Sequence, residues 1–220
     1  MSDAVIFDWD GTIADTRQAV VASFQETLRG IGVHVEDAFI EKRIGIGAIN
    51  TFKETLEVAG KPFTEIMLKE LVKQKIVAQV NFADTVTLFD GAIALLASLR
   101  NRVWIGLASM NNRKVILNLL RKMRLREYFQ AVITADEVRY PKPCPDIFLE
   151  CARRLGCLPD RCVVVEDSVF GVEAALGAGM KCIAVPTGAY TRRQLEKMKP
   201  DLAVNSLKER QKILSFILRS

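Results

Sequence analysis

Histidine is almost absent from this sequence, since it occurs once in 220 residues, at His34. A Ser–His–Asp or Cys–His mechanism would have to use that single residue, and a metal site with several histidine ligands is impossible. We interpret His34 as a solvated residue of a loop. Acid–base chemistry in this protein must therefore depend mainly on carboxylates and lysines.

Cysteine is also scarce, and its pattern disfavours two kinds of cross-linked fold. The five cysteines are odd in number, lie in the last third of the chain and form no Cys-x-x-Cys pair. This pattern argues against a disulfide framework and a zinc knuckle, and we expect reduced, packed thiols. The five residues are Cys144, which we interpret as a spectator, Cys151, Cys157, Cys162 and Cys182.

Long apolar runs are missing as well. No stretch of about 18 apolar residues occurs, so no transmembrane helix is expected. The N-terminal sequence MSDAVIFDWD lacks the features of a signal peptide, which predicts a cytoplasmic location. The chain is 50% hydrophobic and 26% charged, as in globular proteins with a sizeable core. Its length fits one domain with a large insertion or two small domains.

No single polybasic block is present, although 31 basic and 26 acidic residues give a net charge of +5. The basic residues are spread over segments such as RKMRLRE and TRRQLEKMK, and such segments are usually solvated helix faces. A mild attraction for small anions is compatible with this charge, and nucleic acid is the weaker alternative. We expect no nucleic-acid or membrane partner, and a monomer or small homo-oligomer.

Short apolar runs alternate with helix-length segments along most of the chain. Such alternation is typical of a doubly wound parallel α/β sheet whose strands are covered on both faces. Strands are predicted at residues 4–7, 103–107, 131–134, 162–165, 181–185 and 202–204. Helices are predicted between them at 91–100, 112–123, 145–155, 169–178 and 192–198, with a closing amphipathic helix at 208–219.

One region interrupts this alternation, because residues 16–83 contain no convincing strand. Helices are predicted there at about 17–30, 37–43, 48–59 and 64–80, the first opened by a capping box of Asp15 and Gln18. We therefore expect a Rossmann-like core at residues 1–15 and 84–220 and an inserted all-helical cap at 16–83. Hinges are expected near 14–16 and 82–86. One apolar face of the third cap helix is predicted to contain Ile49, Phe52, Leu56 and Ala59.

Polar residues follow four of the predicted strands where each strand ends. Because ligands of open parallel sheets bind beyond the carboxyl ends of the strands, these residues are candidate site residues. Unpaired carboxylates at one place would repel one another, and hard oxygen donors without histidine favour Mg²⁺ and a phosphate. The candidates are Asp8 and Asp10, then Ser109 and Asn111, then Lys142, and finally Glu166 and Asp167.

The order of these residues resembles a known family. The segments DWDGT, ASMN, PKPCPDIFL and VVEDSVFGVEAA are similar to the four motifs of the haloacid dehalogenase (HAD) superfamily, from Val5 to about Val185. A helical cap between the first motif and the second strand resembles the subgroup with phosphoglycolate phosphatase and β-phosphoglucomutase. The resemblance implies a phosphoric monoester hydrolase with Mg²⁺ as cofactor.

The resemblance also implies roles for individual residues. Asp8 would be the nucleophile that accepts the phosphoryl group. Asp10 would protonate the leaving oxygen and then activate water, while its main-chain carbonyl binds Mg²⁺. Trp9 replaces an aliphatic residue of the family, but only its main-chain amide would face phosphate.

The remaining motif residues would bind the phosphoryl group or the metal. Ser109 would bind the phosphoryl group with Asn111 nearby, although Asn111 could instead cap the following helix. Lys142 would neutralise the oxygens of the nucleophile and the phosphate. Asp167 would bind Mg²⁺ directly, and Glu166 directly or through water.

Four functions remain open at this point. The preferred one is a small-molecule phosphatase, and a mutase resembling β-phosphoglucomutase is the alternative. The mutase has a histidine and an arginine in its cap where this chain has Val20 and Ala48, and the segment RIGIG is more similar to phosphoglycolate phosphatase. Asp10 argues against a dehalogenase, and the full set of chemical groups argues against a silent binding module.

We therefore expect a Mg²⁺-dependent phosphatase that forms an aspartyl-phosphate and acts on a small phosphorylated metabolite. The cap would close over the site and exclude bulk water. Arg43 in the cap is a candidate substrate ligand, whereas Asp15 is expected to cap a helix.

Overall fold

The computed structural model describes residues 2–219 and contains a six-stranded parallel sheet. The strands lie in the order β5-β4-β1-β6-β7-β8, so the first strand of the chain is central. The doubly wound α/β sheet predicted from the sequence is thereby confirmed. The strand bounds are β1 Ala4–Phe7, β4 Trp104–Ser109, β5 Ala131–Thr134, β6 Cys162–Glu166, β7 Lys181–Ala184 and β8 Leu202–Ala203.

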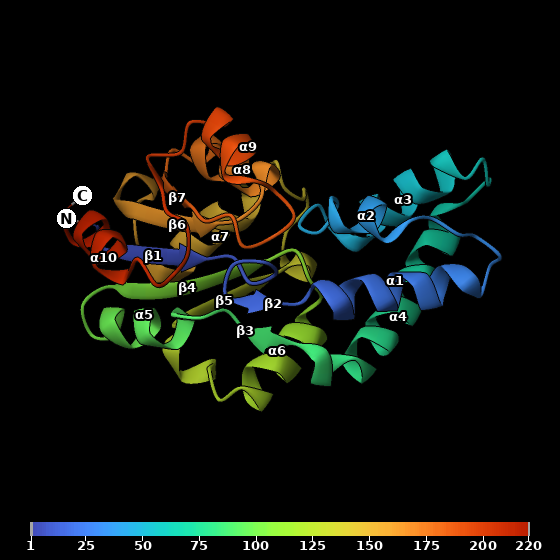
Figure 1. The fold of residues 1–220 in the computed structure, drawn as a ribbon, viewed down its shortest axis with the longest axis horizontal. Helices are drawn as coiled ribbons and strands as arrows, with labels where there is room; N and C mark the ends of the chain where they lie inside the picture. Colours follow the sequence, from blue (N-terminus) through green and yellow to red (C-terminus); the bar gives the residue numbers. More distant parts are fainter. Residues whose placement is uncertain (1, 220) are drawn as a thin grey trace.

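Helices cover both faces of this sheet, with α5 and α6 below it and α8 and α9 above it in Figure 1. Successive strand residues point to opposite faces, so Val5 and Phe7 belong to one hydrophobic core and Ala4 and Ile6 to the other. The first core is completed by α5 Ala92–Leu99, α6 Arg113–Lys122 and α10 Arg210–Arg219. The second is completed by α7 Asp146–Leu155, α8 Val169–Gly177 and α9 Arg192–Lys197.

Four short 3₁₀ helices complete the connections. They are η1 Ala83–Thr85, η2 Arg126–Tyr128, η3 Ala135–Glu137 and η4 Pro159–Arg161. The helix η3 follows β5 directly and therefore lies at the carboxyl edge of the sheet.

The cap consists of four helices that lie to the right of the sheet in Figure 1. They form a third hydrophobic core, in which the rings of Phe24 and Phe52 have centroids 4.7 Å apart. Each large side chain buried there contributes about 1.5–3 kcal/mol. The inserted helical cap is confirmed, whereas its boundaries at 16 and 83 remain a prediction. The helices are α1 Arg17–Arg29, α2 Asp37–Glu41, α3 Ala48–Val58 and α4 Glu65–Asn81.

A second, two-stranded sheet was not predicted. The strands β2 (Ala14–Asp15) and β3 (Thr87–Leu88) pair antiparallel and tie the two ends of the cap insertion together. The predicted capping box of Asp15 and Gln18 is not formed, because Thr16 occupies the N-cap and Asp15 Oδ1 accepts a hydrogen bond from the Arg17 amide at 3.2 Å.

The buried face of α3 also differs from the prediction. Ile49 is 48% exposed and Ala59 is exposed, whereas Phe52 and Leu56 are fully buried. The buried side chains at Thr51 and Thr55 show that the packed face is turned toward the threonines, because α3 packs on α1 and α4 through that side.

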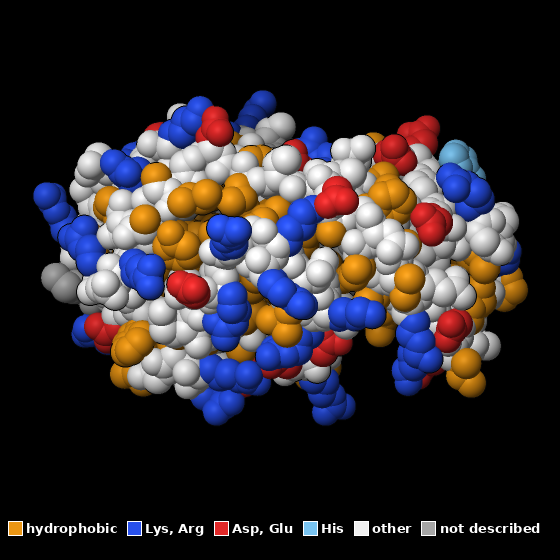
Figure 2. Space-filling model, turned by 90° about the horizontal axis from the view of Figure 1, so that it is seen from below, with side chains coloured by type: hydrophobic (Ala, Val, Ile, Leu, Met, Phe, Trp, Pro, Cys, Tyr) orange, Lys and Arg blue, Asp and Glu red, His pale blue; other side chains and the backbone are white. Residues whose placement is uncertain are grey.

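Charge and cysteine patterns complete the description. Figure 2 shows Lys and Arg side chains spread over the core and the cap, with acidic, polar and apolar atoms between them.

All five cysteines are free thiols, but Cys144 is exposed and so was wrongly expected to be packed. Within residues 2–219, no helix is long and apolar enough to cross a membrane.

Candidate active site

The seven predicted site residues are all buried at the carboxyl edge of the central sheet. Asp8 follows β1, Ser109 ends β4 and Glu166 ends β6, so parallel pairing alone places three of them side by side. Their exposed fractions do not exceed 8%, which means that charges and hydroxyls here are shielded from bulk water. The set comprises Asp8, Asp10, Ser109, Asn111, Lys142, Glu166 and Asp167.

Lys142 lies between two carboxylates and joins them. Its Nζ donates hydrogen bonds of 2.6 Å to Asp8 Oδ1 and 2.6 Å to Glu166 Oε1. Burial opposes a charge on Lys142, but the adjacent charges of Asp8 and Glu166 outweigh that effect and raise its pKa. Lys142 is therefore a fixed positive charge beside the proposed nucleophile at any ordinary pH.

Asp8 is held in a place that is unfavourable for its negative charge. Burial, followed by repulsion from Glu166, Asp167 and Asp10, raises the pKa of Asp8, although the charge of Lys142 opposes the shift. One carboxylate oxygen accepts from Lys142, which directs the other oxygen away from the lysine. A group that must attack phosphorus needs such a free oxygen.

Asp10 is fixed by three donors from two different parts of the chain. Asp10 Oδ1 accepts from Thr16 Oγ1 at 2.8 Å and from Asn111 Nδ2 at 3.2 Å, and Oδ2 accepts from Ser109 Oγ at 2.9 Å. Asn111 therefore faces the site, and the alternative that it caps the next helix is wrong. The N-cap of α6 is Asn112, whose side chain accepts from the Lys114 amide.

Glu166 and Asp167 have different surroundings despite being neighbours. Glu166 Oε2 accepts from the amides of Asp167 and Ser168 and from Ser168 Oγ, so both of its oxygens bind groups of the protein. Asp167 Oδ1 accepts from Thr12 Oγ1 at 2.8 Å. Burial and the charge of Glu166 raise the pKa of Asp167.

Two glycines allow the backbone to approach Asp167. Gly11 has a φ of +92°, and a Cβ atom there would overlap the Asp167 carboxylate. A Cβ atom at Gly188, in the loop after β7, would overlap Asp167 Oδ2. Two loops therefore enclose this carboxylate so closely that neither position can hold a side chain.

The oxygen atoms of Asp8 and Asp167 have the chemistry that a hard cation such as Mg²⁺ requires. Fewer side chains are free to bind it than was predicted from the sequence. Among residues 2–219, no three acidic, histidine or cysteine side chains form a metal-binding group. Glu166 and the side chain of Asp10 use their oxygens within the protein. Carboxylate oxygens of Asp8 and Asp167 and the main-chain carbonyl of Asp10 are the oxygens that would hold Mg²⁺, which prefers oxygen ligands and keeps several waters.

A small cavity separates this site from the cap. It has a volume of about 30 Å³ and is lined by residues of both parts, among them Asp10, Asn111, Arg43 and Lys75. This volume has room for only a few water molecules, so the cap in this structure is closed. Arg43 is less free than expected, because its Nε pairs with Glu54 at 2.7 Å and its NH1 donates to the Phe39 carbonyl.

Lys75 was missed by the sequence analysis. It lies on α4, is 4% exposed, donates to Gln79 Oε1, and has its Nζ 5.1 Å from the ring centroid of Phe24. Burial lowers the pKa of Lys75 to about 8, with Asp10 opposing the shift. The Nε2 atom of Gln79 is buried without a partner among the described residues. A buried pair with unused donors is typical of a binding site.

The cap contacts the core on the opposite side of the site too. The hydroxyl of Tyr190 donates to the Lys42 carbonyl at 2.8 Å, and Arg17 donates to the Gly188 carbonyl at 3.4 Å. These contacts connect the loop after β7, which encloses Asp167, to α1 and to the segment after α2.

Comparison with known proteins decides the family. The family model of haloacid dehalogenase-like hydrolases matches residues 5–185, which include the whole site. This chain belongs to the haloacid dehalogenase-like hydrolases. The resemblance seen in the four motifs is thereby confirmed.

Curated relatives of this hydrolase are named as phosphatases. The chain is 31% identical over 185 residues to the fructose-1-phosphate phosphatase YqaB of Escherichia coli, covering 82% of this chain and 95% of that protein. It is 33% identical over 207 residues to hexitol phosphatase A of the same organism, covering 93% and 91%. The expected class, a HAD-type phosphoric monoester hydrolase, is confirmed by these relatives.

Solved structures share the fold of this chain. A β-phosphoglucomutase of Clostridium difficile superposes with a TM-score of 0.85 at 27% identity, covering 95% of this chain and 93% of that one. A hydrolase from Pseudomonas syringae reaches a TM-score of 0.89 at 23% identity over 99% of both chains, which shows the common fold.

Proposed function

We propose that this hydrolase is a Mg²⁺-dependent phosphatase that releases inorganic phosphate from a small sugar or polyol phosphate through an aspartyl-phosphate. The observation that carries this proposal is the pairing of buried Lys142 with Asp8, beside an Asp10 fixed by Ser109 and Asn111. Such a site supplies a nucleophile, an acid and fixed positive charge within one shielded pocket.

The first half of the reaction forms the covalent intermediate. The free oxygen of Asp8 attacks phosphorus, and the bond from phosphorus to the leaving oxygen breaks with its electron pair. Asp10 gives its proton to that oxygen, so an alcohol rather than an alkoxide leaves. Lys142 stabilises the charge on the phosphoryl oxygens, and the hydroxyl of Ser109 adds to this when it turns from Asp10 to the phosphoryl group.

The second half returns the enzyme to its starting state. Asp10, now a carboxylate, removes a proton from the water that attacks the phosphorus of the aspartyl-phosphate. The acyl phosphate bond breaks, inorganic phosphate leaves and the carboxylate of Asp8 is restored. The bonds to Thr16 and Asn111 keep Asp10 in place through both steps. When bound, Mg²⁺ would supply additional neutralisation of carboxylate and phosphate charge near Asp8 and Asp167.

The cap residues favour a hydroxylated leaving group. Lys75 and the unpartnered Nε2 of Gln79 are hydrogen-bond donors, and hydroxyl oxygens of a sugar or polyol can accept from them. The relatives named for fructose 1-phosphate and hexitols support the same class of substrate. Val20 and Ala48, which stand where the mutase has a histidine and an arginine, line the cavity, and Arg43 in its wall is paired with Glu54. The two cap residues of the mutase are therefore absent here, which disfavours the mutase.

A panel of phosphorylated metabolites tests the proposal. Fructose 1-phosphate, hexitol phosphates, phosphoglycolate and a nucleoside monophosphate are incubated with the protein and Mg²⁺, and phosphate release is measured. We expect the highest kcat/KM for the sugar and polyol phosphates, loss of turnover in EDTA and its recovery with Mg²⁺. Asp8→Asn should abolish turnover, and ordinary turnover by that folded variant would exclude the covalent mechanism.

The mutase alternative has its own assay. Glucose 1-phosphate is supplied with its bisphosphate activator, and glucose 6-phosphate and inorganic phosphate are both measured. Formation of glucose 6-phosphate without phosphate release would favour the mutase over the proposed phosphatase.

A further inference from the structure

We infer that Asp136 and Glu137, on the 3₁₀ helix η3 outside the pocket, are positioning residues for the phosphoryl-transfer site. They bind the start of α6 and the helix α7, and so fix the loop that presents Ser109 and Asn111. This inference rests on the proposed phosphatase function, because it concerns the same site. Neither residue touches the reacting groups.

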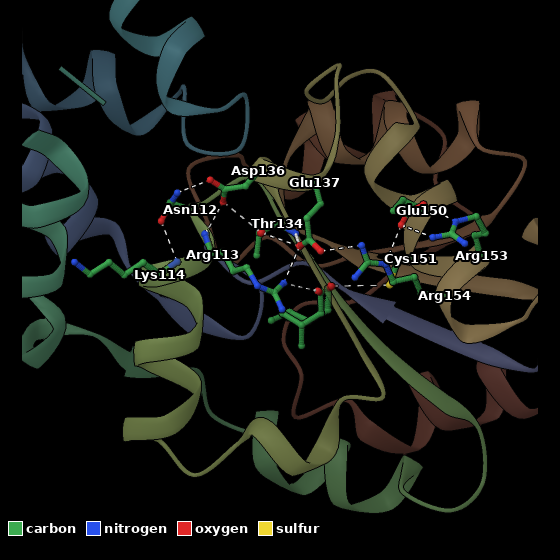
Figure 3. Close-up of polar contacts among 12 residues, drawn as sticks. Asn112, Arg113, Lys114, Thr134, Asp136, Glu137, Glu150, Cys151, Arg153 and Arg154 are labelled. Carbon is green, nitrogen blue, oxygen red and sulfur yellow. Dashed lines mark hydrogen bonds and ion pairs between the residues drawn. The ribbon is translucent and has the colours of Figure 1, made fainter. Parts of the chain in front are cut away.

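Asp136 binds the loop immediately after the phosphate-binding residues, as Figure 3 shows. Asp136 Oδ1 accepts from Asn112 Nδ2 at 2.6 Å, and Oδ2 accepts from the Arg113 amide at 2.7 Å. The main chain adds a third link, since the Ala135 amide donates to the Asn111 carbonyl at 3.1 Å. The segment from Asn111 to Arg113 is therefore attached to η3 at three consecutive residues.

This attachment reaches Asp10 through short steps. The Asn111 amide donates to Ser109 Oγ at 3.0 Å, and both side chains donate in turn to Asp10. The bond from Asn111 Nδ2 to Asp10 is 3.2 Å long, at the upper end of the ordinary range, so a small displacement of the loop would break it. Asp136 thus acts on the proposed general acid through the loop that it binds.

Glu137 connects the start of α6 to the helix α7. Glu137 Oε2 accepts from Arg113 NH1 at 2.9 Å, and Oε1 pairs with Arg154 NH2 of α7 at 2.9 Å. The same Oε2 accepts from the amide and the hydroxyl of Thr134 at the end of β5. In Figure 3 the Glu137 side chain lies between the two arginines, with only 16% of it exposed.

The two acidic residues therefore attach the loop that carries Ser109 and Asn111 to the end of β5 and to Arg154 of α7. Ser109 and Asn111 must hold their places to within a fraction of an ångström if they are to stay aligned with Asp10 and the phosphoryl group. Glu150, by contrast, pairs with Arg153 and Arg154 on α7 alone and makes no such bridge.

Three variants and one control test the inference. Asp136→Ala removes both acceptors, Asp136→Asn keeps one acceptor and the side-chain shape, and Glu137→Gln weakens the bond to both arginines. Glu150→Gln is the control, because it changes an ion pair with the same Arg154 without touching the loop. For each protein, kcat, KM, the inhibition constant of orthophosphate and the melting temperature are measured, the kinetic constants with the best substrate of the panel.

We expect Asp136→Ala to lower kcat by about tenfold, because the acid and the phosphate donors lose their alignment. Orthophosphate should inhibit it more weakly, whereas KM should change less than kcat. Asp136→Asn should recover part of each loss, Glu137→Gln should change the same quantities less, and Glu150→Gln should resemble the wild type.

Wild-type kcat, KM and orthophosphate inhibition in Asp136→Ala, with a lower melting temperature, would overturn the inference. Asp136 would then only stabilise the start of α6. If that variant does not fold, Asp136→Asn and Glu137→Gln carry the test, and wild-type values in both would overturn it equally. If the wild-type protein hydrolyses nothing in the panel, the proposed function fails by itself. Calorimetric binding of orthophosphate by the same variants then still decides whether η3 positions the loop.

Discussion

At the scale of single residues, the buried lysine of the cap lowers the stability of the folded protein at neutral pH. Lys75 has a pKa lowered to about 8 by burial, so the folded protein disfavours its charged form. Between about pH 8 and its usual value of 10.5, the unfolded chain binds a proton that the folded chain does not. Stability should therefore rise with pH in this window, and the full penalty is present below pH 8.

Lys75→Met should accordingly make the protein more stable at pH 7, by about 1–3 kcal/mol, because it removes a charge from an apolar site. The advantage should shrink as the pH approaches 10.5. Urea unfolding at pH 7 and at pH 10 measures both effects. Lys69→Met, on the exposed side of the same helix, should show no such pH dependence. A less stable Lys75→Met at pH 7 would mean that the lysine charge is fully compensated.

The proposed acid makes a prediction that depends on the leaving group. Asp10→Ala should lower kcat by about 10²–10⁴-fold for a sugar phosphate, whose alkoxide cannot leave without a proton. The loss should be smaller in the burst of p-nitrophenol from p-nitrophenyl phosphate, because nitrophenolate leaves unprotonated. Stopped-flow absorbance measures this burst, with the exposed Asp160→Ala as control. Equal losses for both substrates would remove Asp10 from its role as acid.

The predictability of these residues depends on where they stand in the chain. Asp8 and Ser109 lie at the ends of strands, and an apolar run in the sequence is enough to predict such a strand. The other site residues were predicted from the order of the four motifs. Lys75 and Gln79 lie within a helix whose buried face continues from Leu68 and Leu71. A lysine and a glutamine on that apolar face were the available signal, but sequence periodicity alone cannot distinguish a buried lysine from one whose stem merely covers the core.

At the scale of secondary-structure elements, the loop after β7 matters because Gly188 lies against the Asp167 carboxylate. Gly188→Ala should lower kcat/KM by more than about tenfold, because the new methyl group would displace the Asp167 carboxylate. Gly177→Ala is the matched control at the end of α8, where the nearest atom to an added Cβ is Pro145 Cβ at 4.0 Å. It should keep full activity and gain up to about 1 kcal/mol of stability.

Steady-state kinetics and thermal melting of both variants check this prediction. Wild-type kcat/KM in Gly188→Ala would show that the loop can move away from Asp167, and that its close approach does not matter for catalysis.

The elements themselves were predicted unevenly. The long strands and helices are found within one or two residues of their expected positions, because apolar runs and helical spacing extend over enough residues to be recognised. The strands β2 and β3 have two residues each and were missed, since no pattern can be read from so short a segment. The face of α3 was assigned wrongly because its threonines, which are buried, count as polar in a periodicity argument.

At the scale of the whole molecule, layer architecture follows from the sequence but strand order does not. Alternating strands and helices require a covered parallel sheet, whereas the central position of β1 depends on which neighbours pair with it. That central position matters, because it puts Asp8 between the ends of β4 and β6 and therefore among all other site residues.

The closed cap leads to a prediction about the size of the substrate. Tyr190 and Arg17 hold the cap to the core, and the cavity of about 30 Å³ beneath it leaves no path for a polymer. In the proposed reaction, opening of the cap would admit a sugar phosphate, and the acid–base steps would require the cap to be closed over the leaving group. A phosphorylated peptide and a 5′-phosphorylated oligonucleotide should therefore give kcat/KM values at least about 100-fold below the best sugar phosphate. Phosphate release measures all three, with a nonspecific alkaline phosphatase as a control for substrate quality, and similar values for polymer and sugar would show that the cap does not enclose the substrate during turnover.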